Sequence, residues 1–139
     1  MFRRAFSLAE LMVAMLVVSI GLLSIAGAVI YSTRIGTQSA RQTRALQYSK
    51  QIIALSKLSN LPRVAPINDA PGDRVPMEAP PFQSQITASP DFKRNVRMQP
   101  LSNDPNDYRS QLYNVDVTVY WYDRGRELSL RDQAIHRSP

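Results

Sequence analysis

The longest apolar run in the chain covers residues 11–31 and predicts a membrane-spanning helix. No charged residue occurs between Glu10 and Arg34. At 1.5 Å per residue, about 21 helical residues span roughly 30 Å, the thickness of the hydrocarbon core of a bilayer. Gly21 and Gly27 interrupt the run, and small residues of this kind let neighbouring helices approach closely within a membrane or a bundle. The pattern therefore favours a helix that packs against other helices over a lone anchor.

Beyond residue 31 the pattern becomes amphipathic and still helical. No proline occurs before Pro62, and Asn60-Leu61-Pro62 is a plausible stop, because the residue before a proline is pushed out of the helical region. We therefore expect one helix over residues 6–60, with a transmembrane half at 6–31 and an amphipathic half at 32–60. A partner helix in a coiled coil is the alternative to packing on a sheet. The apolar side of the amphipathic half holds Ala45, Leu46, Tyr48, Ile52, Ile53 and Leu55.

The next segment, residues 61–83, is rich in proline and predicts an irregular connection. A β-sheet head is expected over residues 84–139, with weak strand candidates at 85–88 and 92–98. The prolines of the connection are Pro62, Pro66, Pro71, Pro76, Pro80 and Pro81.

The clearest strand signal lies near the C-terminus. Apolar and polar side chains alternate strictly from Val115 to Trp121, which predicts a half-buried antiparallel strand with Tyr120 and Tyr122 on the opposite face. Asp123-Arg124-Gly125 gives a turn, and residues 127–131 return with Leu128 and Leu130 toward the core. A long helix and a terminal antiparallel sheet define an α+β fold, in which the apolar side of the helix covers the sheet.

Charge and composition exclude several classes of chemistry. The chain has no cysteine, so it can build neither a disulfide nor a thiolate metal site. The formal net charge is +6, but basic residues alternate with acidic ones, and the densest basic stretch, residues 34–57, lies on the predicted helix. We interpret that stretch as a solvated helix face, with lipid headgroups or DNA as alternative partners.

No catalytic residue, metal site or cofactor is predicted, and the chain is not expected to be an enzyme. His136 is the only histidine, which rules out a histidine-based triad or a multi-histidine site within one chain, and it is expected to be solvated. Asp104, Asn106 and Asp107 could offer oxygen ligands to calcium, but the spacing lacks the glycine and distal glutamate of an EF-hand, so a surface turn is expected. Tyr120 and Tyr122 form a possible surface contact.

The N-terminus also has the parts of a secretory signal. Arg3 and Arg4 precede the apolar run, and Ala26-Gly27-Ala28 supplies small residues at a possible cleavage point. Glu10 argues against this hypothesis, because a charge in an inserting segment costs about 2.5–3.5 kcal/mol at mid-membrane and less near the interface. A secreted domain cut after Ala28 and a simple membrane-anchored domain remain alternatives.

The junction Ala5-Phe6-Ser7-Leu8-Ala9-Glu10-Leu11, followed by the uncharged run, resembles the class III leader junction of type IV prepilins and type II secretion pseudopilins. The resemblance implies that a prepilin peptidase removes residues 1–5 by cleavage between Ala5 and Phe6, that Phe6 is N-methylated, and that Glu10 serves assembly. The family usually has glycine before the cut, and Ala5 departs from that pattern. An amine at Phe6 could pair with Glu10 of a neighbouring subunit, which would offset the burial of both charges and fix the register.

Two further segments are similar to PilV-type minor pilins and to the I-type minor pseudopilin of type II secretion: Ser19-Ile20-Gly21-Leu22-Leu23, and the closing strand from Tyr113 with its glycine turn. This resemblance implies a minor pilin that assembles with other pilins, with a type II secretion pseudopilin or a DNA-uptake pilin as alternatives. It also implies a bacterial inner-membrane protein with a periplasmic head, later moved into a pilus or pseudopilus. The basic residues flanking the apolar run favour the opposite orientation by simple count, with two before it and four after it as far as Lys50.

Overall fold

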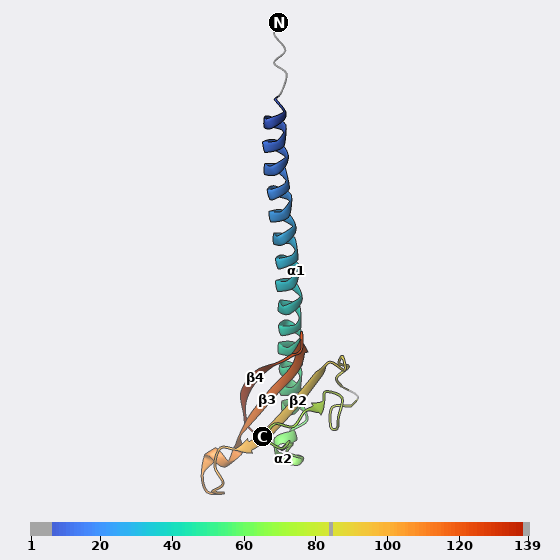
Figure 1. Cartoon of the computed structure of the whole chain (residues 1–139). Coiled ribbons are helices and arrows are strands. Elements are labelled where there is room, and N and C mark those ends of the chain that lie inside the picture. Colours follow the sequence, from blue (N-terminus) through green and yellow to red (C-terminus); the bar gives the residue numbers. More distant parts are fainter. Residues whose placement is uncertain (1–6, 84, 138–139) are drawn as a thin grey trace. The chain divides into compact units, whose positions relative to one another are not determined.

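The computed structural model describes residues 7–83 and 85–137, and the chain forms two compact units, Met1–Ser39 and Ala40–Pro139. The helix α1 (Leu8–Leu58) begins in the first unit and ends in the second (Figure 1). Its 51 residues contain no proline, which would remove a backbone hydrogen bond and break the helix. The proposed cleavage point between Ala5 and Phe6 lies outside the described residues.

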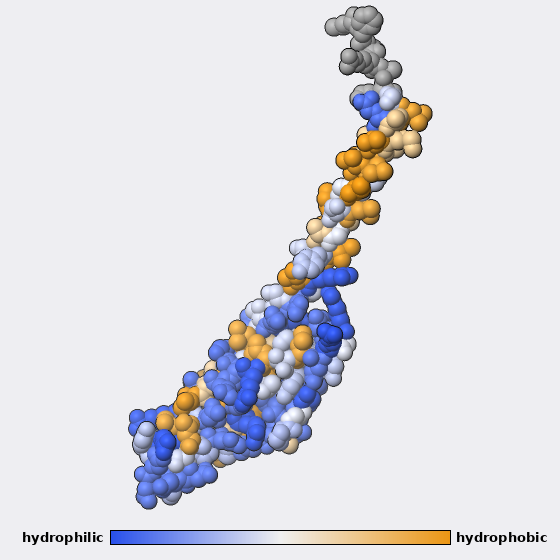
Figure 2. All heavy atoms as spheres, turned by 60° about the vertical axis from the view of Figure 1, so that its left-hand side comes forward, coloured by the Kyte–Doolittle hydropathy of each residue, from blue (hydrophilic) through white to orange (hydrophobic). Residues whose placement is uncertain are grey.

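In the first unit the side chains of α1 are exposed on every side. The large apolar residues range from 79% exposed at Leu8 to 50% exposed at Ile35. Figure 2 shows the hydrophobic atoms gathered along this part of the helix, whereas the visible face of the second unit is largely hydrophilic. Contiguous exposed apolar surface of this kind marks a membrane or protein contact.

The second unit contains a four-stranded antiparallel sheet in the order β1-β2-β3-β4 (Figure 1). The strands are β1 (Val75–Pro76), β2 (Phe92–Pro100), β3 (Leu112–Asp123) and β4 (Arg126–Arg137). The helix packed on this sheet confirms the predicted α+β, pilin-like fold. The alternation also holds: Val115, Val117, Val119 and Trp121 are buried on one face, and Trp121 pairs with Phe92 of β2.

The amphipathic half of α1 covers the core face of the sheet, although the predicted apolar side was partly wrong. Leu46 is 43% exposed, and the buried side of the helix includes Ser49 and Ser56 instead. Their hydroxyls donate to the backbone oxygens of Leu46 and Ile52, so both polar groups are satisfied inside the helix. Small side chains at these positions let the helix approach the strands closely.

β3 and β4 are joined by a two-residue turn. Arg124 and Gly125 both have positive φ, at 51° and 78°, as a type I′ turn requires. β4 continues to Arg137, six residues beyond the predicted return strand, because its polar C-terminal half still pairs fully with β3. The hairpin is therefore longer than the apolar pattern indicated.

The connection between helix and sheet is more ordered than its prolines suggested. After α1 ends, Pro62 lies in the first turn of a short helix, α2 (Leu61–Val64), where its missing N–H costs nothing. Residues 85–88 are not a strand, contrary to the prediction. Ile86 is instead buried as a single core side chain, and its N–H donates to the backbone oxygen of Phe82. A 3₁₀ helix, η1 (Tyr108–Gln111), precedes β3.

Candidate assembly site

The N-terminus of α1 holds Glu10 in a capped helical turn. The backbone N–H of Glu10 donates to the hydroxyl of Ser7 at 3.2 Å, and Ser7-Leu8-Ala9-Glu10 has the sequence of a capping box. A carboxylate in the first turn is also favoured by the positive end of the helix dipole. Glu10 is exposed, and none of the salt bridges found among the described residues includes it. The carboxylate is therefore available to a group from another molecule.

Polar side chains in the apolar part of α1 are satisfied by the helix itself. The hydroxyls of Ser19 and Ser24 donate to backbone oxygens one turn earlier, at 2.8 and 2.9 Å. Thr33 bonds in the same way to the oxygen of Ile30. Within a hydrocarbon environment an unsatisfied polar group costs several kcal/mol, so these bonds suit the helix to lipid or to other helices. By length and composition α1 can cross a membrane.

No described side chain covers the glycines of this segment. A Cβ added at Gly21, Gly27 or Gly36 would meet nothing within 4 Å. Their small size is therefore not explained by packing within the chain. Close approach by a helix from another molecule would explain it.

Two ion pairs join α1 to the sheet within the second unit. Arg41 donates to the backbone oxygen of Tyr122 at 2.5 Å and lies 3.3 Å from the Asp123 carboxylate. Lys50 lies 2.9 Å from Asp132, whose carboxylate, 3.2 Å from the Ser49 hydroxyl, shares the proton of that hydroxyl with the Leu46 oxygen. Burial alone would raise the pKa of Asp132, but the hydrogen bonds from Lys50 and Ser49 leave the pKa below its ordinary value. The helix is thus fixed at both the turn and the middle of β4.

The predicted contact residues Tyr120 and Tyr122 differ in their surroundings. The guanidinium of Arg74 lies 3.7 Å from the centre of the Tyr120 ring, and the same guanidinium donates twice to Glu127, at 2.6 and 2.8 Å. The hydrogen bond to Arg74 lowers the pKa of Glu127. One face of Tyr120 is therefore occupied, whereas Tyr122 is 62% exposed. Of the two, Tyr122 offers the more open surface.

A buried arginine that the sequence pattern did not predict holds the proline-rich connection. Arg94 is 1% exposed on the core face of β2. Its guanidinium donates to the backbone oxygens of Ala79 and Pro80 and lies 3.4 Å from Asp69. Burial lowers the pKa of Arg94, and the charge of Asp69 opposes that shift. An arginine on the apolar side of an alternating strand was the signal that could have revealed it.

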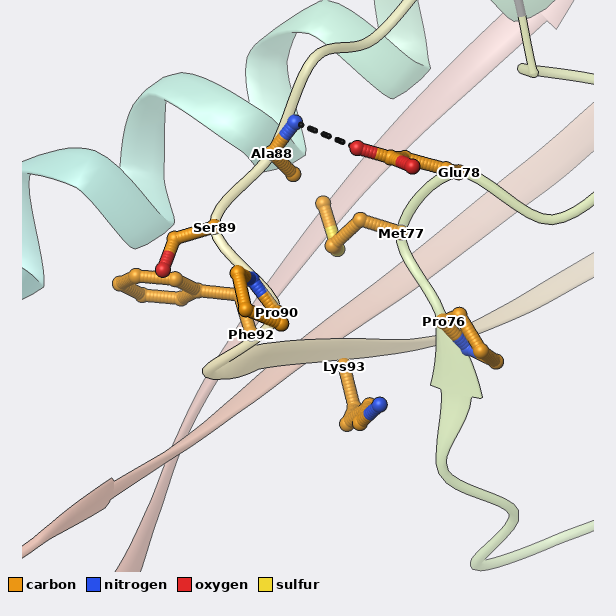
Figure 3. A pocket seen from close by; sticks show the side chains of 8 residues that line it. All are labelled: Pro76, Met77, Glu78, Ala88, Ser89, Pro90, Phe92 and Lys93. Carbon is orange, nitrogen blue, oxygen red and sulfur yellow. Dashed lines mark hydrogen bonds between the residues drawn. The ribbon is translucent and has the colours of Figure 1, made fainter.

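A pocket of about 210 Å³ lies between the connection and the start of β2 (Figure 3). Pro76, Met77, Pro90 and Phe92 supply most of its wall, and the Glu78 carboxylate accepts from the N–H of Ala88 at 3.4 Å across it. Its other polar side chains are those of Ser89 and Lys93. Among the described residues no hydrogen bond or ion pair is found between the side chains of Glu78, Ser89 and Lys93.

Over the part of the chain that the structure describes, no three histidine, aspartate or glutamate side chains are grouped as a metal site would need. In the acidic loop, Asp107 lies 2.8 Å from Arg109, whose hydrogen bond lowers the Asp107 pKa to about 2. Asp104 accepts from the N–H of Asn106. His136 is half-buried, not solvated as predicted, because β4 places it on the core face opposite Tyr113.

These features define a protein with an exposed apolar helix, a carboxylate near the start of that helix and a compact α+β head. Residues 1–26 match the family described as the prokaryotic N-terminal methylation motif. The match supports a type IV pilin-like protein and, with the apolar helix, membrane anchoring. No curated protein and no solved structure matches the chain.

Proposed function

We propose that this chain is a PilV-like minor pilin, a structural subunit that assembles or primes a type IV pilus after processing by prepilin peptidase. The methylation motif at residues 1–26, joined to an apolar helix with all sides exposed, carries the proposal. Such a helix needs lipid before assembly and neighbouring helices after it. Its action is assembly, without catalysis or a cofactor.

Processing supplies the chemistry for subunit pairing. Cleavage between Ala5 and Phe6 creates a new amine at Phe6, which is then N-methylated. In the filament this cation pairs with Glu10 of a neighbouring subunit, since neither charge is stable alone in a low-dielectric core. The carboxylate of Glu10 is exposed and has no ion-pair partner among the described residues, which supports this role.

Before assembly the protein is anchored in the bacterial inner membrane with its head in the periplasm. Its partners are other pilins, in a filament or a tip complex. The alternatives in the same class are an I-type minor pseudopilin of type II secretion and a DNA-uptake pilin. A secreted or membrane-anchored domain with a cleaved signal is the alternative from a different class.

Replacement of the carboxylate tests the assembly role. Glu10→Gln keeps the shape of the side chain and removes its charge, so the variant should insert and be processed normally but be depleted at least tenfold from sheared filaments. Asp91→Asn, at an exposed position of the head, is the matched control and should assemble like the unmodified protein. Equal incorporation of the Glu10→Gln and control proteins would contradict the role of Glu10.

Deletion of the gene separates the filament systems. Loss of surface pili with normal protein secretion supports a minor pilin. Loss of secretion with normal pili identifies a pseudopilin, and loss of DNA uptake alone identifies a DNA-uptake pilin.

A further inference from the structure

Basic residues from two distant parts of the chain meet at the β3–β4 turn. Arg41 of α1 donates to the backbone oxygen of Tyr122 and pairs with Asp123, which places Arg124 of the turn and Arg126 at the start of β4 beside this part of the helix. Arg44 lies three residues beyond Arg41, and residues with this spacing are neighbours on a helix surface. We define Arg41, Arg44, Arg124 and Arg126 as the turn cluster; all four lie within the second unit.

The turn cluster carries uncompensated positive charge. Asp123 pairs with Arg41, and the nearby Glu127 is engaged by Arg74. None of the salt bridges between described residues includes Arg44, Arg124 or Arg126, and all three are exposed. The surface therefore matches an anionic partner.

The chain keeps this surface close to the apolar segment. Six residues separate Ile35 from Arg41, so even a fully extended chain would hold them no more than about 20 Å apart. Positive charge and nearness to the membrane segment together favour a lipid surface.

We propose that the turn cluster binds the headgroups of anionic phospholipids and holds the head against the membrane before assembly. The proposal rests on membrane insertion of the chain, as the proposed function requires. Basic residues at a negatively charged surface each strengthen binding about 5.4-fold, so two of them contribute about 30-fold. Incorporation into a filament would then have to release the head from the membrane.

The absence of cysteine allows a single reporter in the full-length protein. Ser129→Cys, on the exposed face of β4 and three residues beyond Arg126, is labelled with a fluorophore. The protein is inserted into nanodiscs of phosphatidylcholine alone or with one-third phosphatidylglycerol, each containing a lipid with a quencher on its headgroup. Strong quenching should occur only with phosphatidylglycerol, and salt at about 0.5 M should reverse it through screening.

The double variant Arg124→Gln with Arg126→Gln should reduce the ratio of membrane-docked to free heads, as measured by quenching, about 30-fold. Lys57→Gln with Arg137→Gln removes the same charge at exposed positions and should leave the ratio unchanged. Lys57 is about 24 Å along the helix from Arg41, and Arg137 is roughly 36 Å along β4 from Arg126. The control therefore separates the turn cluster from net charge.

Quenching that is equal in both lipids, or equally weakened by both double variants, would overturn the proposal and leave the proposed function intact. Failure of the chain to enter nanodiscs of either composition would overturn both. Binding of duplex DNA that needs Arg124 and Arg126, without lipid-dependent quenching, would assign the turn cluster to nucleic acid instead.

Discussion

At the scale of single residues, the head depends on a few charged groups that join segments far apart in the sequence. Arg94 connects β2 to the backbone of the proline-rich connection, and Arg74 connects that connection to β3 and β4. Lys50 connects the helix to β4 through Asp132. These contacts explain why a connection with six prolines lies in a defined path around the sheet.

Arg94→Ala should lower the free energy of unfolding by about 3 kcal/mol, since it leaves Asp69 without its buried cation and two carbonyls without donors. Lys93→Ala, on the opposite face of β2, should change the free energy of unfolding by less than about 0.5 kcal/mol. Trp121 is the only tryptophan and is buried in the head, so its fluorescence during denaturation in neutral detergent reports the head alone. Equal effects of the two substitutions would contradict the role of Arg94.

Acid should destabilise the head. The pKa values of Glu127 and Asp132 are lowered in the folded protein, so the folded state binds fewer protons than the unfolded state at acidic pH. The stabilisation is complete above the unfolded pKa values, 4.5 for Glu127 and 3.8 for Asp132, and is lost as the pH falls through the folded values. The Trp121 melting midpoint should be constant from pH 8 to 6 and fall below about pH 5.

Removal of these carboxylates supplies the control for the pH experiment. Glu127→Gln with Asp132→Asn should make the decline in melting temperature below about pH 5 shallower. A midpoint that does not change down to pH 3, or an unaltered slope in the double variant, would show that these pairs do not contribute.

At the scale of elements, the helix and the sheet stabilise one another through one buried side of α1. Ile52 is fully buried there, whereas Leu46, which the sequence pattern placed on the same side, is exposed. Ile52→Ala should therefore cost about 2–5 kcal/mol of stability, and Leu46→Ala less than about 0.5 kcal/mol. If denaturant unfolding showed similar losses of stability for Ile52→Ala and Leu46→Ala, both residues would lie on the buried side of the helix, as the sequence pattern predicted.

The β3–β4 turn makes a second prediction at this scale. Gly125→Ala places a side chain at a φ of 78° and should destabilise the head by about 1 kcal/mol or more. Arg124→Gly, at the adjacent position with a φ of 51°, relieves the same kind of strain and should cause no loss. Thermal melts followed at Trp121 would reveal the difference, and a loss of equal size in both variants would contradict a type I′ turn.

The sequence predicted those elements whose residues repeat with a clear period. The alternation from Val115 to Trp121 identified β3, and the uncharged run identified the first half of α1. Arg94 obscured β2 because a core-facing arginine breaks the apolar pattern, and its partners lie in another segment. Ser49 and Ser56 are polar residues, so the sequence pattern did not place them in the core. They are nevertheless buried, and their hydroxyls are satisfied by backbone oxygens of the helix.

The candidate site was predictable only in its local part. Ser7 to Glu10 could be recognised because the motif and the cap are contiguous in sequence. The partner of Tyr120 could not, because Arg74 reaches it from a connection without periodicity. The turn cluster likewise depends on a contact between Arg41 and a turn more than eighty residues later.

At the scale of the whole molecule, the two units require different environments. The second unit has its own core of helix and sheet, whereas the first exposes apolar side chains on every side of its helix. Exposure of so much apolar surface disfavours the first unit as a monomer in water, whereas lipid or a bundle of similar helices can bury that surface. The proposed life cycle, from membrane to filament, supplies both environments in turn.

The most direct test of this account is the N-terminus of the mature protein, determined by mass spectrometry on membranes from hosts with and without prepilin peptidase. We predict a chain that starts at N-methylated Phe6 and that is replaced by a chain retaining residues 1–5 when the peptidase is missing. A start at Val29, or an intact Met1 in both hosts, would contradict the pilin proposal and indicate a secreted or simply anchored domain.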